Sequence, residues 1–316
     1  MEPEGQEKEA AESAQARRRQ ASVHLPVLLG EIRSFAPQPT RRLLDATVGL
    51  GGHAHALLSE HPEASLLAFD RDENALAFAR ERLASCLARV EFRHGDFREG
   101  LSGIAPQSLC YALADLGVSS LQLDAPERGF SFRFDAPLDM RMDPRSGRTA
   151  SDILNTASEK ELERILAEFG EEPKARALAR SIVMERRTRT RWTTTTFANL
   201  VRREARGRPG LDPSTRAFQA LRIATNRELQ GLDAGLERLA HLLRPGGRLA
   251  VIAFHSLEDR IVKNTFRSLK KSGSFDLLTP KPLVPQETET RANPRARSAK
   301  LRVIEKRAGK TGEERA

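Results

Sequence analysis

A glycine-rich stretch and an acid beyond it are the first residues whose types and spacing suggest chemistry. The stretch Asp45-Ala46-Thr47-Val48-Gly49-Leu50-Gly51-Gly52-His53 follows a short apolar run, and Asp70 ends the next apolar run. Glycine lets a backbone approach a ligand closely, and an acid roughly 20 residues on is placed to bind ribose hydroxyls. The pair predicts a nucleotide site. A structural turn followed by an unrelated surface Asp is the alternative.

The glycine spacing indicates which nucleotide the site would take. It reads Gly-x-Gly-Gly, whereas a pyrophosphate-binding dinucleotide fold uses Gly-x-Gly-x-x-Gly. Asp45 and Thr47 also put polar groups where a zwitterionic amino-acid moiety could sit. The combination resembles that of class I S-adenosylmethionine-dependent methyltransferases more than that of dehydrogenases, and an NAD-linked oxidoreductase becomes the less favoured alternative.

Three further groups of polar residues follow predicted strands. Asp115 stands before Ser119, Ser120 and Gln122, and we expect this group to position an acceptor, with an Asp that only caps a turn as the alternative. His255 follows a later strand. Asp96 or Phe97, after the third strand, could border an adenine ring, or could belong to an ordinary turn.

Short strands alternating with helices must position these residues. The patterning predicts a doubly wound parallel α/β sheet and an amphipathic helix over Asn74–Leu87. It also predicts one long helix over Ser214–Arg244, which Pro245-Gly246-Gly247 stops. The strands are expected over Leu43–Leu44, Ser65–Asp70, Val90–Phe97, Tyr111–Asp115, Arg248–Phe254 and Lys300–Glu305.

A helical block interrupts this alternation. Ser158-Glu159-Lys160-Glu161 reads as a capping box that opens a helix burying Leu162, Ile165, Leu166 and Phe169, and helices over Lys174–Arg187 and Thr196–Arg206 follow. We therefore expect disordered tails at 1–20 and 308–316, a discontinuous catalytic domain at 21–124 and 215–307, and an inserted helical substrate-recognition domain at 125–214.

Arginines and phenylalanines give this block two features typical of nucleic-acid binding. The phenylalanines of Glu127–Asp135 would be buried in a simple strand but could stack on bases in a loop. The arginines fit an RNA-facing surface and a merely solvated face equally well. They are Arg176, Arg180, Arg186, Arg187, Arg189, Arg191, Arg202, Arg203, Arg206 and Arg208.

Composition narrows the class of partner. The 316 residues carry 52 Lys and Arg against 43 Asp and Glu, a net charge of +9. This excess favours an anionic partner, with nucleic acid ahead of a membrane surface. No apolar run approaches the ~18 residues of a membrane span. Cys86 and Cys110 are the only cysteines, which fits a reducing cytoplasm. A monomer and a homodimer both remain open.

The assembled motifs resemble those of the bacterial N4-cytosine methyltransferases of 16S ribosomal RNA, the MraW family, from about His24 to Lys306. The resemblance rests on DATVGLGGH, DLGVSSLQLD, ERGFSF, PLDMRMD, TRAFQALRI, HSLEDR, TPKPL and NPRARSAKLR. It implies a class I S-adenosylmethionine-dependent methyltransferase fold, a Rossmann-like doubly wound sheet with an inserted all-helical domain. It also implies S-adenosylmethionine as donor and, as acceptor, a cytidine in the decoding region of the small ribosomal subunit. The implied donor-binding residues are Gly51, Gly52, His53, Asp70, Phe97, Asp115 and Gln122.

The catalytic residues follow less directly from this resemblance. Amino-methyltransferases acting on DNA bases usually carry Asn/Asp-Pro-Pro-aromatic after the fourth strand, where this chain reads Asp115-Leu116-Gly117-Val118. The acceptor amine must be held differently, so Asp115, His255 or a backbone carbonyl is the expected proton acceptor. No metal is expected, because His53-Ala54-His55 has no carboxylate or thiol at ligand spacing. A non-catalytic RNA-binding or assembly factor that retains a nucleotide pocket is the alternative from another class.

Overall fold

A computed structural model describes residues 25–204 and 212–308 of the chain. It divides into two compact units, 1–117 with 231–316 and 118–230, which we call the sheet unit and the helical unit. Our expected domain boundaries were 124/125 and 214/215, so the observed helical unit is longer at both ends. The predicted N-terminal tail lies outside the described residues, and so do His24, Arg206 and Arg208. Of the predicted C-terminal tail, only residue 308 is described.

A seven-stranded sheet in the order β3-β2-β1-β4-β5-β7-β6 forms the centre of the sheet unit. Strands β1 to β5 pair in parallel, and β7 runs antiparallel to both β5 and β6. The predicted doubly wound sheet is therefore correct, and β6 is a strand that we did not predict. The strands are β1 (Arg42–Asp45), β2 (Ser65–Asp70), β3 (Val90–His94), β4 (Leu109–Asp115), β5 (Leu243–Ala253), β6 (Phe275–Leu277) and β7 (Lys300–Lys306).

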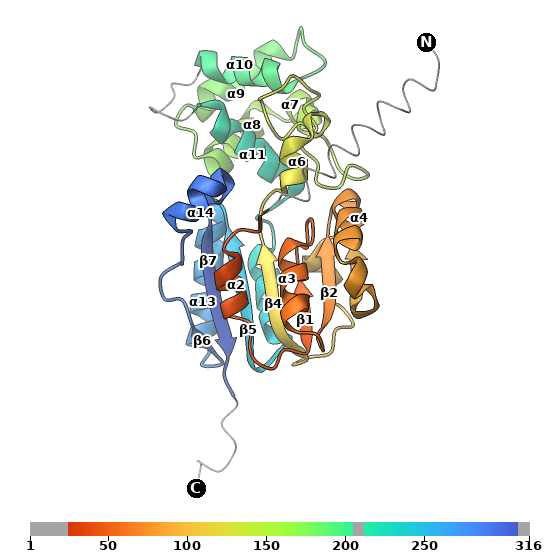
Figure 1. Cartoon of the computed structure of the whole chain (residues 1–316). Coiled ribbons are helices and arrows are strands. Elements are labelled where there is room, and N and C mark those ends of the chain that lie inside the picture. Colours follow the sequence, from red (N-terminus) through yellow and green to blue (C-terminus); the bar gives the residue numbers. More distant parts are fainter. Residues whose placement is uncertain (1–24, 205–211, 309–316) are drawn as a thin grey trace, which may run out of the picture. The chain divides into compact units, whose positions relative to one another are not determined.

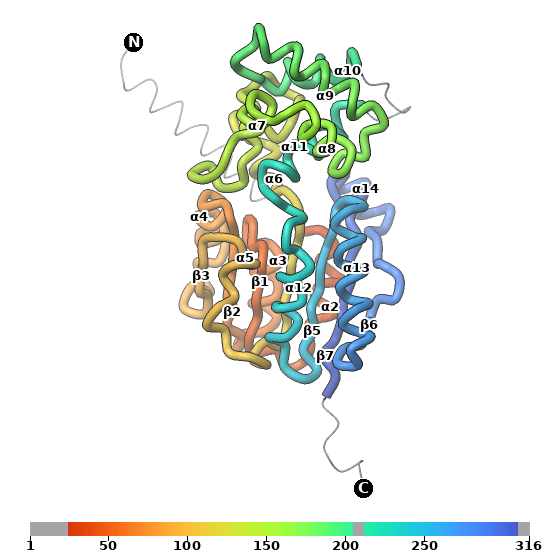
Figure 2. Tube along the Cα trace, turned by 180° about the vertical axis from the view of Figure 1, so that it is seen from behind, coloured from red at the N-terminus to blue at the C-terminus, as the bar shows by residue number. Residues whose placement is uncertain are grey.

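Helices cover both faces of this sheet (Figures 1 and 2). Every residue of β4 from Leu109 to Ala114 is buried, as expected for a strand covered on both sides. Tyr111 and Leu113 pack toward α2 (Leu29–Ser34), α3 (Gly52–Glu60) and α4 (Glu73–Arg82). Ala112 and Ala114 pack toward α5 (Phe97–Gly100), α12 (Leu232–His241) and α13 (Ser256–Lys271). A short helix, α14 (Glu287–Ala292), precedes β7.

The helical unit has its own core. Its helices are α6 (Ser120–Asp124), α7 (Ala150–Thr156), α8 (Glu159–Gly170), α9 (Ala175–Glu185), α10 (Thr194–Glu204) and α11 (Ser214–Asn226). Ser158 caps α8 through the Glu161 N–H. Leu162, Ile165 and Leu166 are buried as predicted, and Phe169 packs against the core while partly exposed. Because this core is separate from the two cores beside the sheet, the helical unit is a compact body of its own.

Two of the predicted helices were wrong in extent. Residues 214–241 form two helices, because Arg227 (φ 49°) and Gly231 (φ 67°) adopt the left-handed conformation that interrupts a helix, and residues 243 and 244 already belong to β5. The first of the two, α11, buries Phe218 and Leu221 in the core of the helical unit. Pro245-Gly246-Gly247 lies inside β5 and stops no helix. The helix predicted over 74–87 ends at Arg82 and continues as a 3-10 turn over Ala84–Arg89.

Within 25–204 and 212–308, no helix is long and apolar enough to cross a membrane.

Candidate active site

The carboxyl ends of β1, β2 and β4 are fastened to one another by hydrogen bonds. After β1, the amide of Ala46 donates to Leu113 O (2.8 Å) and the amide of Val48 donates to Phe69 O (2.8 Å). The hydroxyl of Thr47 accepts from the amide of Asp115 at 2.7 Å. In a doubly wound sheet, the carboxyl edge beside the first strand is where ligands bind. Three strand ends therefore form one rigid frame at that edge.

The glycine turn after β1 leads directly into α3. Gly51 has φ 76° and is the N-cap of α3, and a side chain in this conformation would be strained. A Cβ on Gly52 would stand 2.6 Å from Pro26 Cγ. The packing of the protein itself therefore requires both glycines, in addition to any approach of a ligand. Their contact with the donor stays a prediction.

Asp70 connects β2 to the glycine turn. Its Oδ2 accepts from the amide of Gly49 at 2.8 Å, and its Oδ1 accepts from the amide of Asp72 at 2.9 Å. Burial raises the pKa of Asp70 to about 6, although both amides oppose the shift. The acid lies against the turn, as the spacing in the sequence predicted. Its binding of ribose hydroxyls stays a prediction.

Asp115 and His53 face each other from β4 and α3. Nδ1 of His53 is 3.7 Å from Oδ2 of Asp115, and Nε2 of His53 is 2.9 Å from the carbonyl oxygen of Val27. Oδ1 of Asp115 is buried and accepts no hydrogen bond from any described residue. Burial and the nearby charges of Asp45 and Glu258 hold the pKa of Asp115 well above its usual range. Among the described residues, Oδ1 of this carboxylate therefore has no hydrogen-bond partner, and His53 is the only potential cation within 4 Å of Oδ2.

A third acid, Asp45, intensifies the charge at this edge. It is buried, its Oδ1 accepts from the amide of Thr47 at 3.1 Å, and burial raises its pKa to about 7. Asp45 raises the pKa of Asp115, and Asp70 raises the pKa of Asp45. A cationic ligand offsets the repulsion of Asp45 with Asp115 and with Asp70. S-adenosylmethionine fits this donor set, because it carries a sulfonium and an ammonium group.

Phe97 follows β3, whose end is hydrogen-bonded to Asp70 at the end of β2. The amide of Gly95 donates to Asp70 O at 2.8 Å, which brings the end of β3 against the end of β2. Phe97 follows in α5 and is buried in the core on that face of the sheet. The carboxylate of Asp96 is engaged by Arg71 and by Arg98. Of the two residues proposed to border an adenine ring, Asp96 is therefore committed to ion pairs within the protein.

His255 lies just beyond β5, the strand next to the one that ends in Asp115. Strand β5 pairs with β4, and His255 follows it as the N-cap of α13. The imidazole is nearly buried, and its Nε2 lies 3.1 Å from Oε1 of Glu258. The other carboxylate oxygen of Glu258 accepts from the amide of Phe254 at 2.8 Å. His255 is thus held by the start of its own helix, and its catalytic role stays a prediction.

Gln122 belongs to the helical unit. Its side chain is buried, and it forms a reciprocal capping box with Ser119 at the start of α6. The other predicted donor-binding residues all belong to the sheet unit. The structure thus gives Gln122 a structural role, and its contact with the donor stays a prediction.

Glu258 and the residues around Pro26 were not among the predicted site residues. The signal for Glu258 was present, because an acid three residues after an N-cap is typical of a helix start. Nothing in the local sequence indicated that Pro26 and Val27 lie against Gly52 and His53, since 26 residues separate Val27 from His53.

These features together define a class I S-adenosylmethionine-dependent methyltransferase. The sheet order has one reversed strand between β5 and β6, a glycine turn follows β1, and acids end β2 and β4. The chain belongs to the MraW methylase family, whose sequence model matches residues 21–307.

Named relatives extend along almost the whole chain. A Cyanothece protein, "Ribosomal RNA small subunit methyltransferase H", is 50% identical over 288 residues, covering 90% of this chain and 95% of the relative. A Citrifermentans bemidjiense protein of the same name is 45% identical over 306 residues, covering 90% and 98%. Among solved structures, an rRNA methylase from Streptococcus thermophilus has a TM-score of 0.41 and 13% identity, covering 90% of this chain and 99% of that one.

Proposed function

We propose that the protein transfers a methyl group from S-adenosylmethionine to the exocyclic N4 of a cytidine in the decoding region of 16S ribosomal RNA. The observation that carries the donor half is the buried Oδ1 of Asp115, which lacks a partner among the described residues at the edge that Asp70 shares. The acceptor half is supported by relatives at 45–50% identity that are named for small-subunit ribosomal RNA. The N4 position is supported by the motif resemblance.

In this proposal each acid interacts with a different part of the donor. Asp70 accepts from the ribose hydroxyls, and Asp45 with Asp115 compensates the positive charge of the amino-acid end and the sulfonium. The donor supplies an electrophilic methyl group on a positively charged sulfur. The protein supplies position, because the strand ends that carry the acids are locked by Ala46, Val48 and Thr47.

The acceptor amine needs a hydrogen-bond acceptor. The N4 lone pair is delocalised into the cytosine ring, so an acceptor for an N4 proton localises that pair and stabilises the charge developing on nitrogen. The bond from carbon to sulfur breaks as the bond from carbon to N4 forms, and N4 then loses a proton. Asp115 is the first candidate to receive this proton, because its buried Oδ1 accepts no hydrogen bond from any described residue. His255, at the start of α13 just beyond the adjacent strand β5, is the second.

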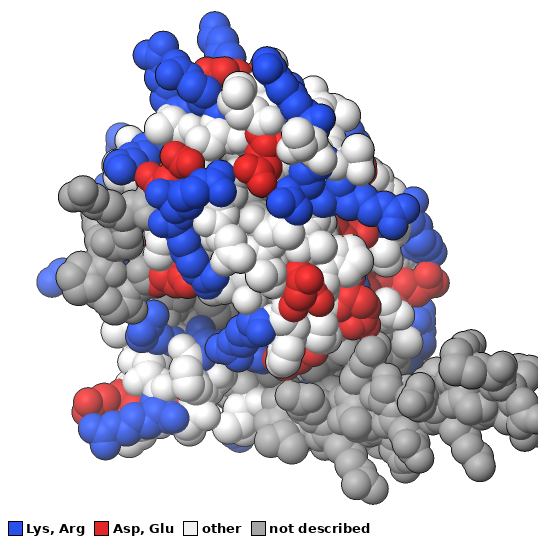
Figure 3. Space-filling view, turned by 90° about the horizontal axis from the view of Figure 1, so that it is seen from above, with Lys and Arg blue, Asp and Glu red and all other residues white. Residues whose placement is uncertain are grey.

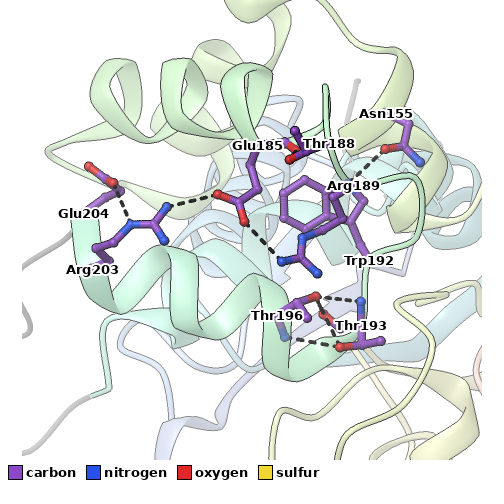
Figure 4. A network of polar contacts seen from close by, with 9 residues as sticks. All are labelled: Asn155, Glu185, Thr188, Arg189, Trp192, Thr193, Thr196, Arg203 and Glu204. Carbon is purple, nitrogen blue, oxygen red and sulfur yellow. Dashed lines mark hydrogen bonds and ion pairs between the residues drawn. The ribbon is translucent and has the colours of Figure 1, made fainter.

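The structure separates arginines that hold the helical unit together from arginines that are open to a ligand. Nη1 of Arg186 donates to the carbonyl oxygens of Ala157 (2.6 Å) and Leu154 (3.3 Å) at the end of α7. Arg189 pairs with Glu185 at 3.2 Å and lies over the Trp192 ring, and Glu185 also binds Arg203 (Figure 4). These three arginines therefore have partners within the protein.

Arg180 and Arg202 also have partners, Glu159 and Asp212. Three other arginines of the set are better candidates for RNA phosphate. The side chains of Arg176, Arg187 and Arg191 are exposed and make no ion pair with any described residue. Lys and Arg side chains on the face in Figure 3 are interspersed with acids and form no continuous basic stripe. We therefore place phosphate contacts at individual arginines, with Arg187 and Arg191 foremost.

Of the phenylalanines in residues 127–135 that could stack on a base, Phe134 is the only one whose ring is largely exposed (60%).

Transfer of a tritiated methyl group to small ribosomal subunits that lack the modification tests the activity. Incorporation at a cytidine, with loss in Asp70→Ala, is expected. Donor binding without incorporation would support the non-catalytic assembly factor instead.

Salt dependence tests the arginines. Arg187→Ala with Arg191→Ala should raise the KM for subunits, leave donor binding unchanged and reduce the logarithmic salt slope by about 0.7–0.9 per lost contact. Arg164→Ala is the matched control, because Arg164 is exposed but paired with Glu168. Parallel salt plots for the double variant and wild type would remove both residues from the RNA path.

A further inference from the structure

Residues 25–28, which precede α2, lie against the candidate donor site. Pro26 occupies the space beside Gly52, where a Cβ would come within 2.6 Å of it. The carbonyl oxygen of Val27 lies 2.9 Å from Nε2 of His53. We call residues 25–28 the N-terminal segment. It fixes the side of His53 that points away from Asp115.

The contact with Val27 determines the chemical state of the imidazole. A carbonyl oxygen only accepts hydrogen bonds, so Nε2 of His53 carries the proton that is donated to it. In the neutral ring Nδ1 is then the acceptor nitrogen, and Nδ1 is the atom 3.7 Å from Asp115 Oδ2. A displaced Val27 would release the ring to rotate or change tautomer. The position of the N-terminal segment therefore controls what His53 presents to Asp115.

The N-terminal segment is held by side chains from near the other end of the chain. Leu28 has φ 54°, a left-handed conformation that is unfavourable for a residue with a Cβ. Its amide donates to Oε1 of Glu289 at 2.7 Å. Nδ2 of Asn293 donates to the carbonyl oxygen of Leu25 at 3.3 Å. The carboxylate of Glu289 thus stabilises the turn that presents Val27 to His53.

We propose that Glu289 is a positioning residue for the donor site, acting through Leu28 and Val27 on the orientation and tautomer of His53. The inference rests on the proposed use of His53 and Asp115 for S-adenosylmethionine.

The setting of Glu289 favours this role over a purely structural one. Helix α14 carries no buried residue, so its contribution to the hydrophobic core is small. The Leu28 side chain is fully buried and packs with the sheet through its own apolar contacts. Removing the Glu289 carboxylate should therefore leave the fold intact while loosening the backbone that orients His53.

Calorimetric binding of S-adenosylmethionine to the full chain tests the proposal. Glu289→Ala should weaken donor binding by about 3- to 10-fold, a part of what a hydrogen bond to a charged group contributes. Glu289→Gln keeps an acceptor oxygen without the charge and should be intermediate. Glu287→Ala is the control, because Glu287 lies on the same helix and pairs only with the exposed Arg291. This control should bind like wild type.

A double-mutant cycle shows whether Glu289 acts through His53. In a His53→Ala background, Glu289→Ala should cause no further loss of donor affinity, because the side chain that it positions is gone. Additive losses would overturn the proposal. ¹⁵N chemical shifts of His53 give an independent readout. Wild type should show a protonated Nε2, and Glu289→Ala should show a mixture of tautomers. A tautomer unchanged in that variant would also overturn the proposal.

Two outcomes distinguish a failure of the proposed function from a failure of the proposed role of Glu289. If wild type does not bind S-adenosylmethionine, the proposed function fails. If wild type binds the donor and Glu289→Ala binds it equally well, only the role of Glu289 fails.

Discussion

Donor affinity should depend on pH, because binding of a cation requires carboxylates that are partly protonated in the free protein. The pKa of Asp70 is raised to about 6 and that of Asp45 to about 7, in both cases mainly by burial. The ionised forms accept hydrogen bonds and compensate the charge of the donor. Binding therefore lowers both pKa values and releases protons, and affinity rises as the pH rises through 6 and 7.

The size of the change in Kd follows from the ionised fractions of Asp70 and Asp45. With a pKa of about 6, Asp70 is about 97% ionised at pH 7.5 and about 9% at pH 5, which raises the Kd about 11-fold. If Asp45 must ionise as well, its pKa of about 7 adds a further factor of about 80. The slope of log Kd against pH at the acid end thus counts the acids. One decade per pH unit indicates that one acid must ionise, two indicate that two must, and three indicate that Asp115 ionises as well.

Isothermal titration calorimetry from pH 5 to 7.5, in buffers with different ionisation enthalpies, measures both the Kd and the protons released. Asp70→Asn should weaken binding at pH 7.5 by about 10- to 100-fold and remove one titrating group from the profile. Circular dichroism at each pH controls for unfolding. A wild-type Kd that is constant over this range would refute the reasoning. So would an Asp70→Asn profile with the wild-type slope.

Three further variants test other parts of the site and fold. Asp115→Asn keeps the shape and removes the charge. It should lower donor affinity if Asp115 serves mainly the donor, or lower kcat by ~10²-fold or more with donor binding kept if it serves the amine. Wild-type values for both would contradict either role. Glu258→Gln removes a charge that raises the pKa of Asp115, so carboxyl NMR should show that pKa falling, and an unmoved pKa would show that the two acids are not coupled. Gly129→Ala should destabilise the helical unit by about 1–3 kcal/mol, because Gly129 has φ 71° and a Cβ there would meet Pro137 O and stand 2.7 Å from Asp139 N. Thermal melts will show the loss, and an unchanged melting temperature would mean that the turn can relax.

Local signals in the sequence were sufficient for much of the sheet unit. The strand over Ser65–Asp70 was predicted to the residue, because a buried parallel strand is a short apolar run bounded by polar residues. The placement of Asp70 beside the glycine turn followed from the same logic, since the winding of the chain brings the carboxyl ends of adjacent strands together. The break in the alternation likewise revealed the inserted helices.

Helix ends were predicted less well where the apolar pattern continued across a break. Leu and Phe recur at helical spacing from Ser214 to Arg244, so periodicity alone predicted one helix. The chain instead turns at Arg227 and Gly231 and divides the pattern between two bodies. Periodicity reports which face of a helix is buried. It does not report which core buries it.

The residue types in the site came from the sequence, and their electrical state came from the tertiary structure. The sequence by itself determined that acids would end β2 and β4, because strand patterning is local. The raised pKa values of Asp45, Asp70 and Asp115 depend on burial and on one another's charge, which only the packed sheet produces. The hydrogen bond between Leu28 and Glu289 spans 261 residues. No local pattern encodes such a pair, because only the folded sheet brings residues 28 and 289 together.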